Sequence, residues 1–115
     1  MSIVNHETGV LTAIRKAQEI SALGGGLDDT HVYFVQRGGI DGPVKIGASS
    51  NVVRRLAELQ IGSPEPLRII GVWLLAGRKA ESGLHRMHAA DRLAGEWFAP
   101  TTDVMESARC FGGAA

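Results

Sequence analysis

The sequence predicts a small α/β domain of the α+β type, with a three-stranded, mainly antiparallel sheet flanked by helices and an extra helix in front. Two observations support this fold class: short β-branched and aromatic segments alternate with segments of helical periodicity, and turns rich in glycine and proline separate them. The 115 residues suffice for one such domain. We expect residues 1–29 to form the N-terminal helix and a glycine-rich linker, and residues 30–115 to form the domain.

The first elements follow from periodicity and turn residues. Residues 7–23 carry apolar side chains at helical spacing, and the triple glycine at 24–26 ends that helix. The β-branched and aromatic segment at 31–36 and the segment VKIG at 44–47 predict a hairpin with a seven-residue loop. A helix then begins at Ser50 or Asn51, either of which can cap it, and runs to about Gln60.

The second half of the chain alternates in the same way. Residues 67–77 are almost wholly apolar, which predicts a central strand buried on both faces. A helix is expected over about 79–93, and the GEWF segment that follows is expected to form a turn or a short extended piece. The segment from 101 to 111 predicts a closing helix capped by Thr101 or Thr102.

Composition excludes several classes of protein. Hydrophobic residues make up 44%, charged residues 21% and mean hydropathy is +0.04, as in a globular protein. Because there is neither an apolar run near the roughly 18 residues of a membrane span nor a secretory signal, we expect a cytoplasmic protein without a membrane partner. The net charge is +0, yet residues 31–92 hold nine Lys and Arg against five Asp and Glu, which is compatible with a polyanionic partner.

The predicted helix after the hairpin carries two adjacent arginines. Its buried stripe contains Val52, Leu56 and Leu59, so Arg54 points to solvent and Arg55 lies along the seam between helix and sheet. Arg55 is therefore either a functional cation at the strand ends or one partner of an ordinary seam salt bridge.

The predicted helix at 79–93 carries four polar residues on one face. Glu81, His85, His88 and Arg92 follow at i, i+4, i+7 and i+11. This set is natural if it lines a cleft, and it can equally be a solvated face. A zinc site built from His85 and His88 fits poorly, since these residues match no closed tetrahedral set.

The hairpin places three further candidates near the same end of the sheet. Tyr33 is a lone tyrosine on the first strand, while Lys45 and Gly47 share one face of the second, so Lys45 is expected across the hairpin from Tyr33. Gly47 allows close approach of a ligand, and the helix N-terminus behind it favours anions.

These residues resemble the GIY-YIG nuclease superfamily. HVY ending at Tyr33 falls on its first signature and KIG at 45–47 on its second, with 11 residues between them. The helix arginine of the family, eight residues past that glycine, falls on Arg55, and its metal-binding glutamate falls on Glu81. The pattern is similar in particular to a small phage and bacterial branch in which Leu-His follows the glutamate and Gly-Glu-Trp-Phe closes the motif; the match covers about residues 31–109.

The resemblance implies a GIY-YIG-like fold and a metal-dependent DNA endonuclease or nickase. One Mg²⁺ or Mn²⁺ ion would be held mainly by Glu81, and Arg55 would stabilise charge on the scissile phosphate. Gly47, His88 and Arg92 are expected to bind substrate. Lys45 replaces the second tyrosine of the signature, so the general base is either Tyr33 with Lys45 as helper or His85.

Other interpretations stay open. A catalytically silent nucleic-acid-binding or regulatory module on the same fold is the main alternative, and an interaction module assembled through the helix at 7–23 is another. Glu96 is either a second acidic group of the site or a capping or pairing residue. With one small domain, DNA recognition is expected to depend on a larger partner, on a homodimer or on DNA shape.

Overall fold

The computed structural model describes residues 29–112, which form an α+β domain around one antiparallel sheet. The strands are β1 (His31–Arg37), β2 (Val44–Ser49), β3 (Leu67–Trp73), β4 (Arg92–Ala94) and β5 (Trp97–Phe98). The helices are α2 (Val52–Ile61), α3 (Arg78–Met87) and α4 (Thr102–Phe111), with a 3₁₀ helix at Ala89–Asp91. The predicted fold class is confirmed. The helix predicted at 7–23 and most of its linker lie outside the described residues.

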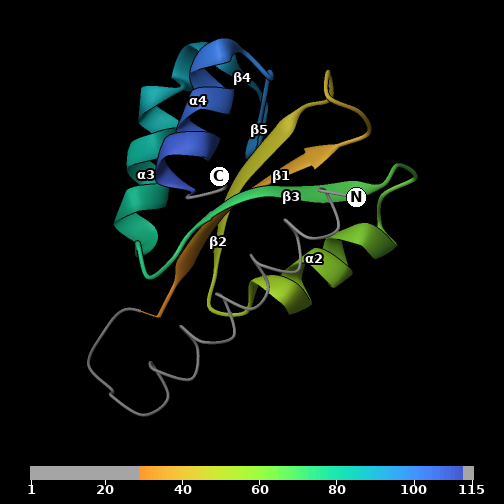
Figure 1. Ribbon diagram of the computed structural model, residues 1–115, viewed down its shortest axis with the longest axis horizontal. Coiled ribbons are helices and arrows are strands. Elements are labelled where there is room, and N and C mark those ends of the chain that lie inside the picture. The colour runs from red at the N-terminus through yellow and green to blue at the C-terminus, as the bar shows by residue number, and fades with distance from the viewer. Residues whose placement is uncertain (1–28, 113–115) are drawn as a thin grey trace.

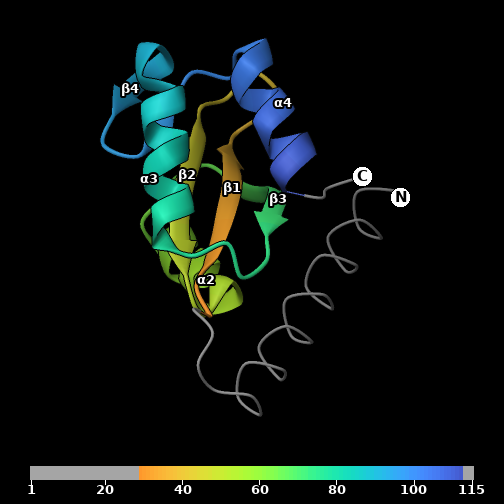
Figure 2. The same ribbon diagram turned by 90° about the vertical axis from the view of Figure 1, so that its left-hand side faces the viewer.

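The sheet separates the helices into two layers. Figure 1 shows α2 on one side of the sheet and α3 with α4 on the other, and Figure 2 shows α3 and α4 side by side over the strands. Alternate residues of a strand point to opposite faces. Val32, Phe34 and Ile46 therefore pack towards α3 and α4, whereas Tyr33 and Val35 pack towards α2.

The hairpin of β1 and β2 sets the register of the site residues. Tyr33 pairs with Gly47, and Val35 pairs with Lys45. Lys45 is thus the diagonal neighbour of Tyr33 across the hairpin, on the face that α2 covers. The predicted placement of Tyr33, Lys45 and Gly47 on one face is confirmed.

The prediction of a central strand at 67–77 was wrong in two respects. The strand ends at Trp73, and β3 lies at one edge of the sheet, in the order β3-β1-β2-β5-β4. Both of its faces are nevertheless covered, since Ile69 and Val72 pack with the α2 cluster and Ile70 packs against the other core. Apolar composition reports this coverage of the faces and carries no information about a strand's neighbours in the sheet.

The helix predicted over 79–93 is shorter than expected. α3 ends at Met87, and Arg92 belongs to β4 instead of the helix. Tertiary hydrogen bonds favour this ending, because the Thr101 hydroxyl donates to Asp91 Oδ2 at 2.9 Å and the Ala99 amide donates to the Asp91 carbonyl at 2.8 Å. The GEWF segment contributes β5, which pairs with β2 and β4, so the sheet has five strands where three were predicted.

Two predicted helix caps are confirmed. The Asn51 side chain accepts from the Arg54 amide at 3.1 Å at the start of α2, and the Thr101 hydroxyl accepts from the Val104 amide at 3.3 Å at the start of α4. Within residues 29–112, no helix has the length and apolar character that crossing a membrane requires.

Candidate active site

A tyrosine and an arginine form the first half of the candidate site. Tyr33 lies on β1 with 2% of its surface exposed, and its hydroxyl interacts with the positively charged guanidinium of Arg55 on α2. Burial raises the pKa of Tyr33, while the Arg55 hydrogen bond and positive charge oppose that rise. Arg54 is 76% exposed and pairs with Glu58, as expected for a solvent-facing residue.

Arg55 forms the seam salt bridge that the sequence allowed and also interacts with Tyr33. Besides its bond to Tyr33, it forms an ion pair with Glu58 at 3.5 Å, and 44% of its side chain is exposed. The hydrogen bond to Tyr33 raises the pKa of Arg55. Arg55 therefore stays charged beside the phenol and presents N–H groups to solvent, where a phosphate can reach them.

Two carboxylates and an imidazole form the second half of the site. One ligand atom each from Glu81, His85 and Glu96 lie within 4.8 Å of one another. Burial raises the pKa of Glu81, and so do the negative charge and the hydrogen bond of Glu96, whereas His85 acts in the opposite direction. Like charges held this close favour either a shared proton or a bound cation.

This donor set fits a hard divalent cation. Carboxylate oxygens suit Mg²⁺ and Mn²⁺, and Mn²⁺ also accepts an imidazole nitrogen. Among residues 29–112, the histidine and carboxylate groups that come together in this way are Glu81, His85 and Glu96 alone. Glu96, which the sequence left between an acidic site group and a pairing residue, is both.

The tautomer of His85 follows from its hydrogen bond to the sheet. His85 Nε2 lies 2.8 Å from the carbonyl oxygen of Ile46 on β2. Because a carbonyl can only accept, Nε2 carries the proton, and in the neutral ring Nδ1 keeps its lone pair. Arg92 Nη2 lies 3.5 Å from that Nδ1 atom. The lone pair thus faces the Arg92 guanidinium, which can only donate, and a metal ion or a proton would have to displace Arg92 to reach it.

Lys45 occupies the boundary between the two halves. Its ammonium lies 3.1 Å from Glu96 Oε1, and only 11% of its side chain is exposed. The cation that affects the Tyr33 hydroxyl is Arg55, whereas Lys45 pairs with Glu96. Tyr33 still feels the site carboxylates, because the charges of Glu96 and Glu81 both contribute to its raised pKa.

The remaining predicted residues divide between the site and the core. Arg92 reaches back from β4 to His85, and its Nε atom donates to the Gly95 carbonyl at 2.6 Å. Gly47 lies directly under the Tyr33 ring. His88 is 3% exposed and bonds Ser107 Oγ at 2.7 Å between α3 and α4. The expectation that His88 shares the face of Glu81 fails, because His88 lies one turn after the buried Leu84, whose carbonyl accepts from the His88 amide, and its ring is therefore buried as well.

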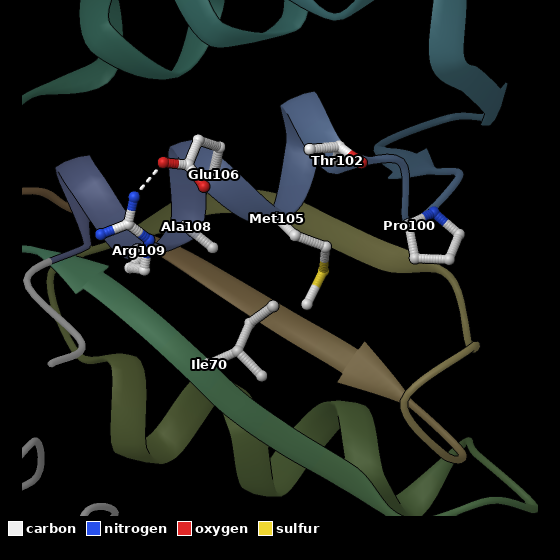
Figure 3. Close-up of a pocket in the computed structure, with 7 residues that line it drawn as sticks. All are labelled: Ile70, Pro100, Thr102, Met105, Glu106, Ala108 and Arg109. Atoms are coloured by element: carbon white, nitrogen blue, oxygen red, sulfur yellow. Dashed lines mark hydrogen bonds and ion pairs between the residues drawn. The ribbon is translucent and has the colours of Figure 1, made fainter.

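A cavity of about 470 Å³ between β3 and α4 lies apart from these residues. Figure 3 shows its lining, with Ile70 and Met105 facing each other and the ion pair of Glu106 and Arg109 on the outer turn of α4. No residue of the candidate site lines it, so it is no part of the chemistry described above.

Fold and site together define a small α+β domain in which two carboxylates, an imidazole and an arginine–tyrosine pair gather at one end of a β-hairpin. The chain belongs to the T5orf172 domain family, a phage-associated family related to nuclease-type folds, whose model matches residues 30–111. That match includes every residue of the candidate site. No curated protein and no solved structure matches the chain significantly.

Proposed function

We propose that this domain is a metal-dependent DNA endonuclease or nickase of the GIY-YIG type. The observation that supports it is the convergence of the arginine–tyrosine pair of Arg55 and Tyr33 with the ligand cluster of Glu81, His85 and Glu96. The five residues come from β1, α2, α3 and the turn between β4 and β5, so local sequence alone does not produce the arrangement. The membership of a nuclease-related family supports the same class of reaction.

In this proposal, Glu81 would hold a single Mg²⁺ or Mn²⁺ ion together with Glu96 and His85, and such an ion would supply Lewis-acid chemistry to the scissile phosphate. Arg55 donates to the phosphate oxygens as negative charge develops on them. The N-terminus of α2, capped by Asn51, adds a partial positive charge near the same strand ends.

Tyr33 is the first candidate for the general base, with Arg55 rather than Lys45 as the group that favours its ionised form. The Arg55 guanidinium and a neighbouring divalent cation both lower the energy of a tyrosinate, and this opposes the effect of burial. His85 is the second candidate, since the bond from Nε2 to the Ile46 carbonyl leaves Nδ1, the neighbour of Arg92, as the nitrogen that would take a proton.

The decisive experiment is cleavage of supercoiled plasmid DNA with Mg²⁺ or Mn²⁺ by the wild type, Glu81→Ala and Arg55→Ala. We expect both variants to lose at least about 100-fold in rate, as is usual when a group that stabilises developing charge is removed. Arg54→Ala, one residue away and exposed, is the matched control and should cleave normally. Equal cleavage by all four proteins would remove the proposed site.

The same experiment decides the alternative of a silent nucleic-acid-binding module. Salt-dependent DNA binding that EDTA leaves unchanged, without cleavage by the wild type, would favour that alternative. If cleavage is seen, the pH dependence of Tyr33→Phe and His85→Ala identifies the base, because replacing the base removes the limb of the profile that the base controls.

A further inference from the structure

A pocket on the α2 side of the sheet adjoins the candidate site without sharing its residues. Its volume is about 310 Å³, and its walls include Arg37, Glu58, Leu59, Pro64 and Trp97. It therefore combines an indole, a guanidinium, a carboxylate and aliphatic surface. Pockets of roughly this size and mixture bind small, flat, partly apolar groups.

The Trp97 ring connects this pocket to the ligand cluster. Trp97 on β5 pairs with Lys45 on β2, and the Lys45 ammonium lies 5.6 Å from the centre of the indole ring. The same ammonium lies 3.1 Å from Glu96 Oε1. A phosphate that contacts Lys45 at the edge of the cluster is therefore beside the pocket, with its attached nucleoside within reach of Trp97.

Arg37 supplies a second flat surface in the pocket. Its guanidinium carbon lies 4.7 Å from the centre of the Trp97 ring, and its ion pair with Glu65 is 3.5 Å long, with 38% and 55% of the two side chains exposed. Such an exposed pair holds a side chain weakly, so Arg37 can adjust to a ligand. Nucleobases stack on both aromatic rings and guanidinium planes.

The Glu58 carboxylate decides between a base and a phosphate as the occupant. Glu58 lines the pocket and is paired with Arg54 and Arg55 on α2. A carboxylate repels a phosphate but accepts hydrogen bonds from the N–H groups of bases, which include the ring N3–H of thymine as well as amino groups. Leu59 and Pro64 complete an apolar edge that suits a base and does nothing for a phosphate.

We propose that this pocket binds one unpaired nucleobase of the DNA strand that is cut, next to the scissile phosphate. The proposal rests on the proposed nuclease function and names its substrate class: DNA with a single-stranded nucleotide beside the cut. A base inside a duplex is stacked and paired, and entering the pocket would require it to leave the helix at a cost of a few kcal/mol. An already unpaired base avoids that cost.

The test uses the full chain with Trp73→Phe, which leaves Trp97 as the sole tryptophan. In EDTA, so that cleavage plays no part, an oligothymidylate should quench Trp97 fluorescence and bind as tightly as it does to the wild type. Trp97→Leu should weaken oligothymidylate binding about 5- to 150-fold, the range for loss of one stacked base. Binding of a blunt duplex should change less than about twofold.

Further results separate stacking of a base from a structural role of Trp97, and the base pocket from the nuclease function. Trp97→Phe keeps an aromatic face and should retain most of the affinity for the oligothymidylate. If Trp97 had a merely structural role, the Phe and Leu variants would instead differ in their thermal unfolding. Absence of quenching, or equal loss of single-strand and duplex binding in Trp97→Leu, would overturn the proposal that the pocket binds a nucleobase. A wild type that never cleaves yet shows quenching would refute the nuclease function and leave the base pocket standing.

Discussion

Replacing Gly47 by alanine should damage the site at a position that contacts neither metal nor substrate through its own side chain. A Cβ atom at Gly47 would lie 2.3 Å from both Cζ and the hydroxyl oxygen of Tyr33, and 2.9 Å from Cε1. Ordinary contacts to such an atom begin at about 3.4 Å. The phenol must therefore move by at least about 1.1 Å, the difference between 3.4 and 2.3 Å.

Tyr33 has little room for such a shift, because its ring is 2% exposed and packs beside Val52 and Val72. Overpacking of this kind costs about 1–3 kcal/mol of folding stability. The movement also disturbs the interaction of the phenol with Arg55, since that interaction depends on the position of the hydroxyl. Displacing a catalytic group by about 1 Å can slow a reaction about 100-fold.

The assay compares Gly47→Ala with Gly39→Ala in urea unfolding and in plasmid cleavage. A Cβ at Gly39 meets nothing within 4 Å, so this matched control should keep both stability and rate. Gly47→Ala should lose roughly 1–3 kcal/mol of unfolding free energy and about two orders of magnitude in cleavage rate. A Gly47→Ala protein with wild-type stability and rate would refute the reasoning about the Tyr33 contact.

Two more predictions concern the carboxylates. Burial and Glu96 raise the pKa of Glu81 above its ordinary value of 4.5, so the metal-free protein loses folding stability as pH rises through the folded-state pKa. Glu81→Gln should remove that loss, and in EDTA at neutral pH it should be more stable than the wild type by up to about 1 kcal/mol. This difference in stability should shrink as pH falls towards 4.5. A difference independent of pH in urea unfolding would contradict this. Lys45→Met removes the cation that competes for Glu96, so Mn²⁺ measured by titration calorimetry should bind several-fold more tightly, and weaker binding would count against the competition.

Local signals predicted the elements whose formation depends on local interactions. Asn51 and Thr101 cap their helices with side-chain hydrogen bonds that span three residues, so the sequence near them contains the whole cause. The end of α3 at Met87 could not be predicted in this way. It depends on the bond from Thr101 to Asp91 and on His88 reaching Ser107, contacts across 10 and 19 residues.

The candidate site was likewise predictable where local interactions determine it, and not where contacts between distant elements do. Tyr33, Lys45 and Gly47 share a face because strand alternation and hairpin register require it. The role of Glu96 could not be read from its neighbours, since its carboxylate acts on Glu81 from another element and on Lys45 from a third. What placed it there is the pairing of β5 with β2, a two-residue strand whose hydrogen bonds have no periodic signal in the sequence.

Lys45 illustrates how one residue type can connect chemistry and recognition in a small domain. A tyrosine at this position would place a hydroxyl beside the cluster, but it could not neutralise Glu96 when the cation site is empty. The ammonium does this at 3.1 Å and also lies over the Trp97 ring. If Glu96 held a divalent ion, as the proposed function requires, the ammonium would be released to bind a phosphate of the DNA. Under the proposed function, binding of the metal and binding of the strand therefore favour each other, and Lys45 is the residue through which they are coupled.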